Sequence, residues 1–511
     1  MGRNPPSRFD PDERKLSMRA LRLAAAIAAA VGLLALPATV SAARAQTVGE
    51  GSPNLSLVKN LSYETAEGSN ITNGGTDIEF ATIAGRDYAL AGSYKNGLQI
   101  VDITDPTAAE IVGVYDCVVQ QGDVQVFERE ELTEEGEPVT KTYVGYTMDT
   151  GYTPGVGSTC FTEATELGFS PKGQRFGSFI ADISDPTNPV TVSWVPFAQG
   201  SHNHTVDPSG KYIYNSNSDL ITSTEPAIEI SDITDLSNPR AVGELPLPFI
   251  PGLGSESHDI TFNEDGTRAY SAALSHTNVI DTTDKENPVI LSTIVDPMIN
   301  VHHQADPVTL TDADGVDHTY LVIEDEVAGA TGTGQCPNGG VHVWDVTDET
   351  LPIKVGYWNI DDVGLTTDNV LGTCTAHVFD IHKQGPSNAV MTIAYYNGGV
   401  RVVDLSNLTG VSLGTQGVGM MELAWYRLPD GDTWSAKTPA IEADGSFYLY
   451  GNDLARGLDI YRYTASAEAS ANPGRWLSAA EAELLLPKAS VPANYKPFCL
   501  LGDDGPLGGI L

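Results

Sequence analysis

The sequence predicts an all-β fold: a seven-bladed β-propeller closed by an N-terminal strand, with a short, partly helical C-terminal tail. A phrase of alternating apolar and polar residues recurs seven times, as in LQIVDITDP at 98–106 and SFIADISDP at 178–186. Such alternation is typical of a half-buried strand, and the Asp, Ser, Thr and Pro that follow favour a tight turn. Successive copies lie 80, 50, 49, 64, 59 and 58 residues apart, which suits one four-stranded blade plus variable loops.

The order of strands within one blade is clearest between Ser257 and Ile294. The pattern predicts strands at about 258–263, 267–274, 277–281 and 288–294, numbered outward from the central channel. The last copy, 437–463, supplies only three strands. The segment NLSLVKNL at 54–61 resembles the fourth strands elsewhere, so we expect it to complete the last blade and close the ring.

Three segments are expected along the chain. Residues 1–45 are interpreted as a signal peptide and N-terminal extension, because Arg19 and Arg22 precede an apolar stretch and small residues that suit cleavage. Residues 46–464 form the propeller. Residues 465–511 form a C-terminal tail that packs on the propeller, with a helix predicted over 475–486.

The charge of the chain limits its partners. It has 28 basic and 67 acidic residues, a formal net charge of −39. This charge argues against nucleic acid and against anionic membrane surfaces. We expect a secreted or cell-envelope protein, monomeric, without a stable membrane span after signal cleavage. Its ligand is a small molecule or an extracellular polymer or protein, bound at the mouth of the central channel.

The repeated phrase is similar to that of the LVIVD-repeat proteins, a family of exported bacterial β-propellers. The resemblance covers about 54–464. It implies the propeller architecture but little about a reaction, because one fold can carry many functions.

Histidines recur at one position of the repeat. When the blades are aligned on the turn after their first strand, four consecutive blades begin that strand with a histidine, and blade five offers both His302 and His303. The predicted metal ligands are His202, His258, His303 and His377. Propeller closure gathers these positions around one mouth of the channel, where neutral imidazoles would suit zinc, copper or iron. In the same alignment, blade seven has Lys437 at this position.

Loops at the same mouth carry carboxylates. Glu324, Asp325 and Glu326 follow the second strand of blade five. Of these, Glu324 or Asp325 is predicted to be the catalytic base or a partner that orients an imidazole.

Five cysteines remain in the exported chain. Their places in the blades predict disulfides Cys117–Cys160 and Cys336–Cys374, with Cys499 left over. The alternative is that cysteines and histidines bind metal together, although no C-x-x-C pair is present.

The sequence is compatible with two classes of function. One is a metal-dependent enzyme, either an oxidoreductase or a hydrolase or lyase. The other is a non-catalytic binding or interaction propeller, or an envelope-associated scaffold, in which the histidines are structural.

Overall fold

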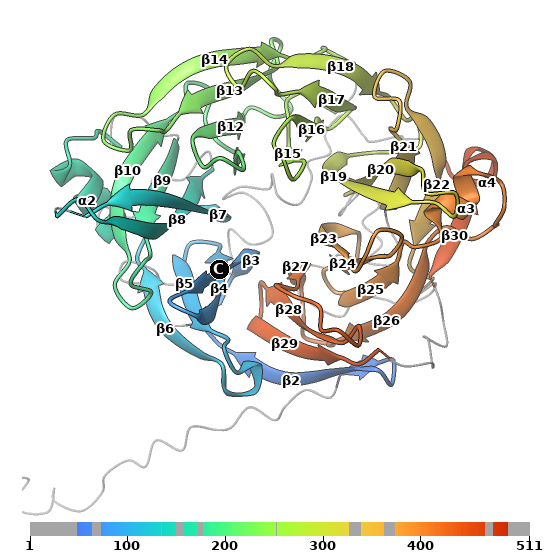
Figure 1. The fold of residues 1–511 in the computed structure, drawn as a ribbon, viewed down its shortest axis with the longest axis horizontal. Helices are drawn as coiled ribbons and strands as arrows, with labels where there is room; N and C mark the ends of the chain where they lie inside the picture. The colour runs from blue at the N-terminus through green and yellow to red at the C-terminus, as the bar shows by residue number, and fades with distance from the viewer. Residues whose placement is uncertain are drawn as a thin grey trace, which may run out of the picture. The chain divides into compact units, whose positions relative to one another are not determined.

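The computed structural model describes residues 49–63, 73–133, 135–149, 158–171, 177–251, 253–326, 339–361, 374–465 and 474–488. These residues form seven antiparallel sheets arranged in a ring around a central axis (Figure 1). The structure thus confirms the seven-bladed β-propeller. The signal peptide and extension expected at 1–45 lie outside the described residues.

The first four blades follow the chain in simple order, each with its first strand innermost. Blade 1 consists of β3 (Gly75–Ile83), β4 (Arg86–Ser93), β5 (Leu98–Asp102) and β6 (Glu110–Tyr115). Blade 2 consists of β7 (Gln121–Leu132), β8 (Pro138–Met148), β9 (Gly177–Asp182) and β10 (Val190–Pro196). Blade 3 consists of β11 (Asn203–Val206), β12 (Tyr212–Ser216), β13 (Ala227–Asp232) and β14 (Arg240–Pro246). Blade 4 consists of β15 (Asp259–Phe262), β16 (Arg268–Ala272), β17 (Thr277–Asp281) and β18 (Val289–Ile294). The blade 4 strands lie within two residues of their predicted bounds.

Each of the last three blades includes one strand from a distant part of the chain. Blade 5 consists of β19 (His302–Thr311), β20 (Asp317–Asp325), β21 (Gly340–Asp345), β22 (Ile353–Asn359) and the added β30 (Arg475–Ser478). Blade 6 consists of β23 (His377–Lys383), β24 (Ala389–Ala394), β25 (Val400–Asp404), β26 (Met421–Arg427) and the added β1 (Glu50–Gly51). Blade 7 consists of β27 (Thr433–Lys437), β28 (Phe447–Asp453), β29 (Gly457–Tyr463) and β2 (Leu55–Leu61).

The outer strand of blade 7 comes from the N-terminal part of the chain. Strand β2 pairs antiparallel with β29, with Leu55 opposite Tyr463 and Leu61 opposite Leu458. Leu55 is buried between blades 6 and 7. The last blade is thereby built from both ends of the propeller sequence.

The aspartates of the repeated phrase have a local structural cause. Asp102 ends the third strand of blade 1, and its Oδ1 accepts a hydrogen bond from the Thr104 amide at 3.0 Å. Asp105 then accepts from the Thr107 amide at 3.0 Å. Equivalent pairs of turns follow in other blades, for example at Asp182 and Asp185. Because an aspartate side chain can hold the amide two residues on, the phrase specifies the turn between the third and fourth strands.

The predicted helix at 475–486 is shorter in the structure, because a strand forms at its start. Arg475–Ser478 extend blade 5 as β30, and only Ala479–Leu485 form a helix, α4. Ser478 caps this helix, since its hydroxyl accepts from the Glu481 amide while the Glu481 carboxylate accepts from the Ser478 amide. The strand is favoured because the Trp476 ring packs over Gly356 and Gly419, where a side chain would collide with it. Among the described residues, no helix combines the length and hydropathy needed to cross a membrane.

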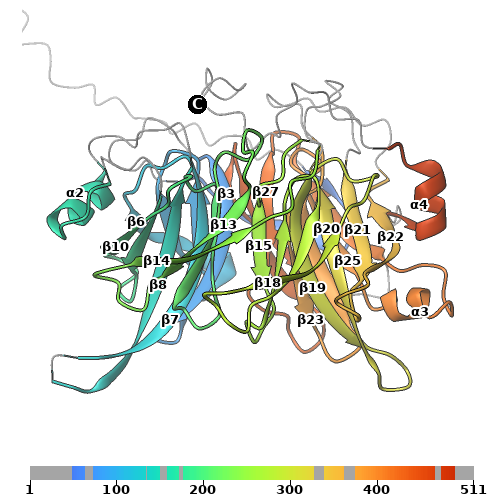
Figure 2. The ribbon, with the colours of Figure 1, turned by 90° about the horizontal axis from the view of Figure 1, so that it is seen from above.

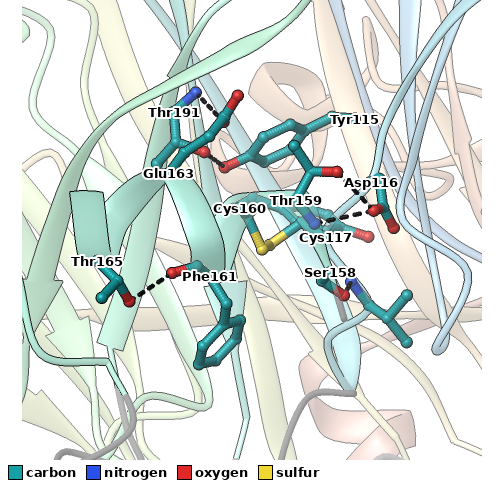
Figure 3. Close-up of a disulfide and its surroundings, with 12 residues drawn as sticks. Tyr115, Asp116, Cys117, Ser158, Thr159, Cys160, Phe161, Glu163, Thr165 and Thr191 are labelled. Atoms are coloured by element: carbon teal, nitrogen blue, oxygen red, sulfur yellow. Dashed lines mark hydrogen bonds between the residues drawn. A yellow bond between two sulfur atoms is a disulfide. The ribbon is translucent and has the colours of Figure 1, made fainter. Parts of the chain in front are cut away.

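The disulfide Cys117–Cys160 is present, as predicted (Figure 3). It ties the segment before blade 2 to the helix α2 (Thr159–Glu166), across 43 residues of sequence. The amide and hydroxyl of Thr159 also donate to Asp116 at 2.9 and 2.8 Å (Figure 3). Cys374 is disulfide-bonded as well. Its predicted partner Cys336, and the remaining Cys499, lie outside the described residues.

Candidate metal centre

The innermost strands line a central cavity of about 330 Å³. We divide the residues that line this cavity into three layers along its axis. In each first strand the first layer is one residue, the second layer is the next residue, and the third layer is two residues further on, as in His303, Gln304 and Asp306. Each first-layer residue lies three positions before a third-layer residue, as His377 lies before Asp380 and His303 before Asp306. The first-layer positions are Thr76, Gly122, His202, His258, His303, His377 and Trp434. Trp434 therefore takes the place that the sequence alignment gave to Lys437, which lies in the third layer.

The four first-layer histidines form a continuous row. Their ring centroids lie 4.3 Å apart between His202 and His258, 4.0 Å between His258 and His303, and 4.6 Å between His303 and His377. None exposes more than 3% of its surface. The Nε2 atoms of His202 and His258 are 2.9 Å apart. The structure therefore brings together the four residues that the repeat placed in register.

The Nδ1 atoms of three of these rings lie close to an oxygen, and those of His202 and His377 form hydrogen bonds to it. His202 Nδ1 lies 3.2 Å from Asp149 Oδ2, and His303 Nδ1 lies 2.6 Å from Glu324 Oε2. His377 Nδ1 lies 2.6 Å from the backbone carbonyl oxygen of Trp434. A carboxylate or carbonyl behind a ligating imidazole is the arrangement that orients histidines in metal sites.

The partner of His377 fixes its protonation. A carbonyl oxygen can only accept, so Nδ1 must carry the hydrogen, and Nε2 presents a lone pair. That Nε2 has no hydrogen-bond partner among the described residues. Its charged neighbour is Glu326 Oε1 at 3.8 Å, while His303 Nε2 lies 3.7 Å from Glu326 Oε2. An imidazole lone pair that faces a carboxylate, with both buried, is stable when a cation lies between them.

The three donors have the spacing of a ligand set. The ligand atoms of His303, Glu326 and His377 all lie within 4.8 Å of one another. Atoms bound to one zinc at about 2.0–2.2 Å lie about 3–4 Å apart, so only a small contraction is required. The Tyr396 hydroxyl donates to Glu326 at 3.0 Å and holds this carboxylate in place.

Burial keeps the imidazoles of His258, His303 and His377 neutral. Removal from water lowers the pKa of His377 to about 3, and burial, then His258, holds the pKa of His303 well below its ordinary value. Burial likewise lowers the pKa of His258. The pKa of Glu324 is raised well above its usual range, again by burial, with Glu326 and Asp325 adding to the effect. Neutral imidazoles at physiological pH are the form that binds transition metals.

The other predicted residues have different roles. Glu324 lies beside His303 Nδ1, but neither of its oxygens forms a hydrogen bond among the described residues. Asp325 is engaged elsewhere, because its two oxygens accept from the Asn300 side chain and the Val301 amide, both at 2.9 Å. His302 points away from its neighbour His303, and its Nδ1 contacts Thr277 Oγ1 at 2.8 Å.

Asp149 and the Trp434 carbonyl are the groups that the sequence did not indicate for the site. The sequence indicates Glu326 as one of three carboxylates at the mouth but predicts the catalytic role for Glu324 or Asp325. The signal for it is the strand alternation, which turns Glu324 and Glu326 to the same face and Asp325 to the other.

The row of histidines lies at the inner end of the cavity. The side chains of Asp77 and Asp123 in the second layer are 10% and 14% exposed, while those of Glu79 and Asp380 in the third layer are 31% and 39% exposed. Solvent therefore reaches the described residues from the third layer. That end lies on the side where the β7–β8 and β19–β20 hairpins extend beyond the ring (Figure 2). The sequence predicts that the four histidines lie at a mouth of the central channel, whereas in the structure they are buried.

Comparison with known proteins agrees with this fold. A family model described as the LVIVD repeat matches residues 84–117, so the chain carries that repeat within blade 1 of a seven-bladed propeller. None of the curated proteins matches the chain.

Among solved structures, one similar chain is the Cps50 (Swd1) β-propeller domain of Myceliophteria thermophila, at 10% identity and a TM-score of 0.45 over 80% of this chain and all of that one. Another is the periplasmic gluconolactonase PpgL of Pseudomonas aeruginosa, at 11% identity and 0.44 over 79% of this chain and 99% of that one. A functionally unknown protein from Desulfotomaculum acetoxidans DSM 771 matches at 14% identity and 0.38, over 65% of this chain and 83% of that one. Likenesses this distant say nothing about the chemistry of the cavity.

Proposed function

We propose that this protein is a metal-dependent enzyme that acts on a small substrate in the central cavity. The ion would be held by Nε2 of His202, His258, His303 and His377, with Glu326 beside it. One observation carries the proposal: the Trp434 carbonyl forces the lone pair of His377 Nε2 towards Glu326, although both groups are buried. A bound cation satisfies both acceptors at once.

The donor set indicates the class of ion. Imidazole nitrogens with one carboxylate suit zinc, copper or iron, and disfavour magnesium or calcium, which prefer oxygen ligands. Bound there, such an ion would supply Lewis acidity and activate water or substrate.

The protein groups around the ion have distinct tasks. Asp149 and the Trp434 carbonyl would hold the rings of His202 and His377 with Nε2 turned inward. Glu324 lies beside the His303 ring without a hydrogen bond to it. Glu326 lies 3.7 Å from His303 Nε2 and 3.8 Å from His377 Nε2, and it would accept a proton from the reacting group. The substrate would enter from the third layer, since that end of the cavity is exposed.

We also propose where the protein is located and that it is a monomer. A disulfide is typical of an oxidising compartment, so Cys117–Cys160 supports export of the chain. We propose that the segment 1–45 directs this export and that the mature protein is a monomer.

The decisive experiment is elemental analysis of protein produced without a histidine tag. We expect about one zinc, copper or iron ion per chain. His258→Ala and His377→Ala should each lower occupancy more than tenfold while the protein still melts cooperatively.

His342→Ala is the matched control, because His342 is equally buried in blade 5 but lies beside Lys354 and Asp296. Its occupancy should equal that of the parent protein. If the native protein carries no metal and takes none up, or if His342→Ala acts like His377→Ala, the histidines are structural and the binding-propeller hypothesis takes over.

A further inference from the structure

Three blades share a rare backbone conformation in the turn between their second and third strands. Lys95 in blade 1, Leu274 in blade 4 and Tyr396 in blade 6 have positive φ values of 59°, 53° and 46°. Residues with a side chain seldom adopt this conformation, and a bulky residue in it costs folding free energy. The surrounding structure must therefore hold these turns in place.

In blades 4 and 6, the strained residue forms a pair of backbone hydrogen bonds with the next blade. Leu274 exchanges them with His302 at 3.1 and 2.8 Å, and Tyr396 exchanges them with Thr433 at 3.0 and 3.1 Å. His302 and Thr433 are each the residue directly before the first layer of their own blade. The two turns thus fix where the first layer begins in blades 5 and 7.

The side chain of Tyr396 distinguishes the turn of blade 6 from that of blade 4. Its hydroxyl donates to Glu326 Oε1 at 3.0 Å, and both residues are fully buried. A hydrogen bond to a carboxylate is stronger than one between neutral groups, and leucine could not form it. The oxygen that Tyr396 holds is the one that lies 3.8 Å from His377 Nε2.

The ring and the backbone of Tyr396 contact the other half of the candidate metal centre. The ring centroid lies 4.5 Å from that of His377 and 5.9 Å from that of Trp434. The backbone bonds to Thr433 fix the start of the following residue, Trp434, whose carbonyl oxygen lies 2.6 Å from His377 Nδ1. One residue of blade 6 is therefore attached to blade 5 through its side chain and to blade 7 through its backbone.

We infer that Tyr396 is a positioning residue of the candidate metal centre, which turns the Glu326 carboxylate and the lone pair of His377 Nε2 towards the same point. Its hydroxyl orients the carboxylate, and its backbone orients the imidazole through the Trp434 carbonyl. The strained turn is retained because its relaxation would displace both groups. That the two groups bind an ion rests on the proposed function, whereas the contact between Tyr396 and Glu326 does not.

Tyr396→Phe removes the hydroxyl and keeps the ring and the backbone. Zinc chloride is added to untagged protein that a chelator has freed of metal, and competition with the chelator measures the affinity. We expect Tyr396→Phe to bind zinc more weakly by about tenfold, as for other groups that orient a metal ligand. Tyr395→Phe is the matched control, because this adjacent and equally buried tyrosine donates to Asn359 at 2.9 Å instead. It should bind zinc like the parent.

A spectrum distinguishes positioning from a general loss of stability. Cobalt(II) chloride, added in place of zinc, gives visible absorption bands that depend on the geometry of the ligands. We expect the bands of Tyr396→Phe to differ from those of the parent, and the bands of Tyr395→Phe to coincide with them. If Tyr396→Phe binds zinc as tightly as the parent, or if all three cobalt spectra coincide, the inference is overturned.

A double-mutant cycle on metal-free protein separates this inference from the proposed function. It compares the urea midpoints of the parent, Tyr396→Phe, Glu326→Gln and the double variant. Because the hydroxyl acts on a carboxylate, Tyr396→Phe should lower the midpoint more in the parent than in the Glu326→Gln background. Equal shifts in the two backgrounds would overturn the inference. If the native protein takes up no metal but the shifts differ, the proposed function fails while the positioning of Glu326 by Tyr396 stands.

Discussion

Blades 3 to 6 and blades 7, 1 and 2 share one repeat but differ at the first layer of the cavity. The first arc places four histidines there, and the second places Trp434, Thr76 and Gly122. Gly122 has a positive φ of 65°, and a side chain at this position would collide with the Tyr146 ring, so blade 2 has no room for a histidine. Trp434 contributes its carbonyl to His377 rather than a ligand of its own.

The second arc contains the contacts that close the ring. Strand β2 completes blade 7, the Tyr63 hydroxyl donates to Asn452 of the same blade, and Cys117–Cys160 ties the start of blade 2. The second arc thus contains contacts that stabilise the ring, and the first arc would bind the ion of the proposed function. Substitutions in the two arcs should therefore separate stability from metal occupancy.

The largest effect should come from deleting residues 46–62. The deletion removes β1 and β2, exposes the edge of β29 and uncovers the apolar neighbours of Leu55 and Leu57. Loss of two leucines and a strand's hydrogen bonds should cost about 5 kcal/mol of unfolding free energy. Urea denaturation measures it, and an unchanged midpoint would show that β2 is dispensable for closure.

This closure could be anticipated from the sequence because the last copy of the repeat lacks a fourth strand. The alternation at 54–61 matched the missing element, and the repeated aspartates marked each turn between the third and fourth strands. Strand β30 and its place on blade 5 could not be anticipated. The segment 475–486 has the composition of a helix, and only the packing of Trp476 over Gly356 favours a strand at its start.

A smaller loss of stability should follow Cys117→Ser. The disulfide encloses 43 residues, and the loss of such a loop constraint costs about 4 kcal/mol in the chain-entropy model. Thermal melting under non-reducing conditions measures this loss. Metal occupancy of the folded variant should match the parent, and a variant that keeps its stability but loses metal would contradict the division between the arcs.

The smallest effect should come from Asp149→Asn, which tests the border between the arcs. Asp149 follows the second strand of blade 2 but contacts His202 of blade 3. Loss of such an orienting carboxylate lowers metal affinity by about 10–100-fold. Competition with a chelator measures the affinity. Asp185→Asn, in an exposed turn of the same blade, is the control and should bind metal like the parent; equal affinities in the two variants would remove Asp149 from the site.

The candidate site could be predicted only where it follows the repeat. Four histidines at one repeat position converge because the propeller brings equivalent positions together. Asp149 lies outside the repeat pattern, at the start of a long connection, so nothing in its spacing marks it. An alignment on the turn glycine gives Lys437 the place of Trp434, because Trp434 lies 11 residues before Gly445, whereas His377 lies 8 residues before Gly385.

The central claim is that four Nε2 atoms converge on a single transition-metal ion, and anomalous X-ray diffraction from crystals of the untagged protein tests it most directly. Data collected above and below the absorption edge of the ion found by elemental analysis should show one strong peak on the propeller axis. The peak should lie about 2.0–2.2 Å from Nε2 of His202, His258, His303 and His377. A metal-loaded crystal with no peak at this position, or with a peak held by other residues, would contradict the account.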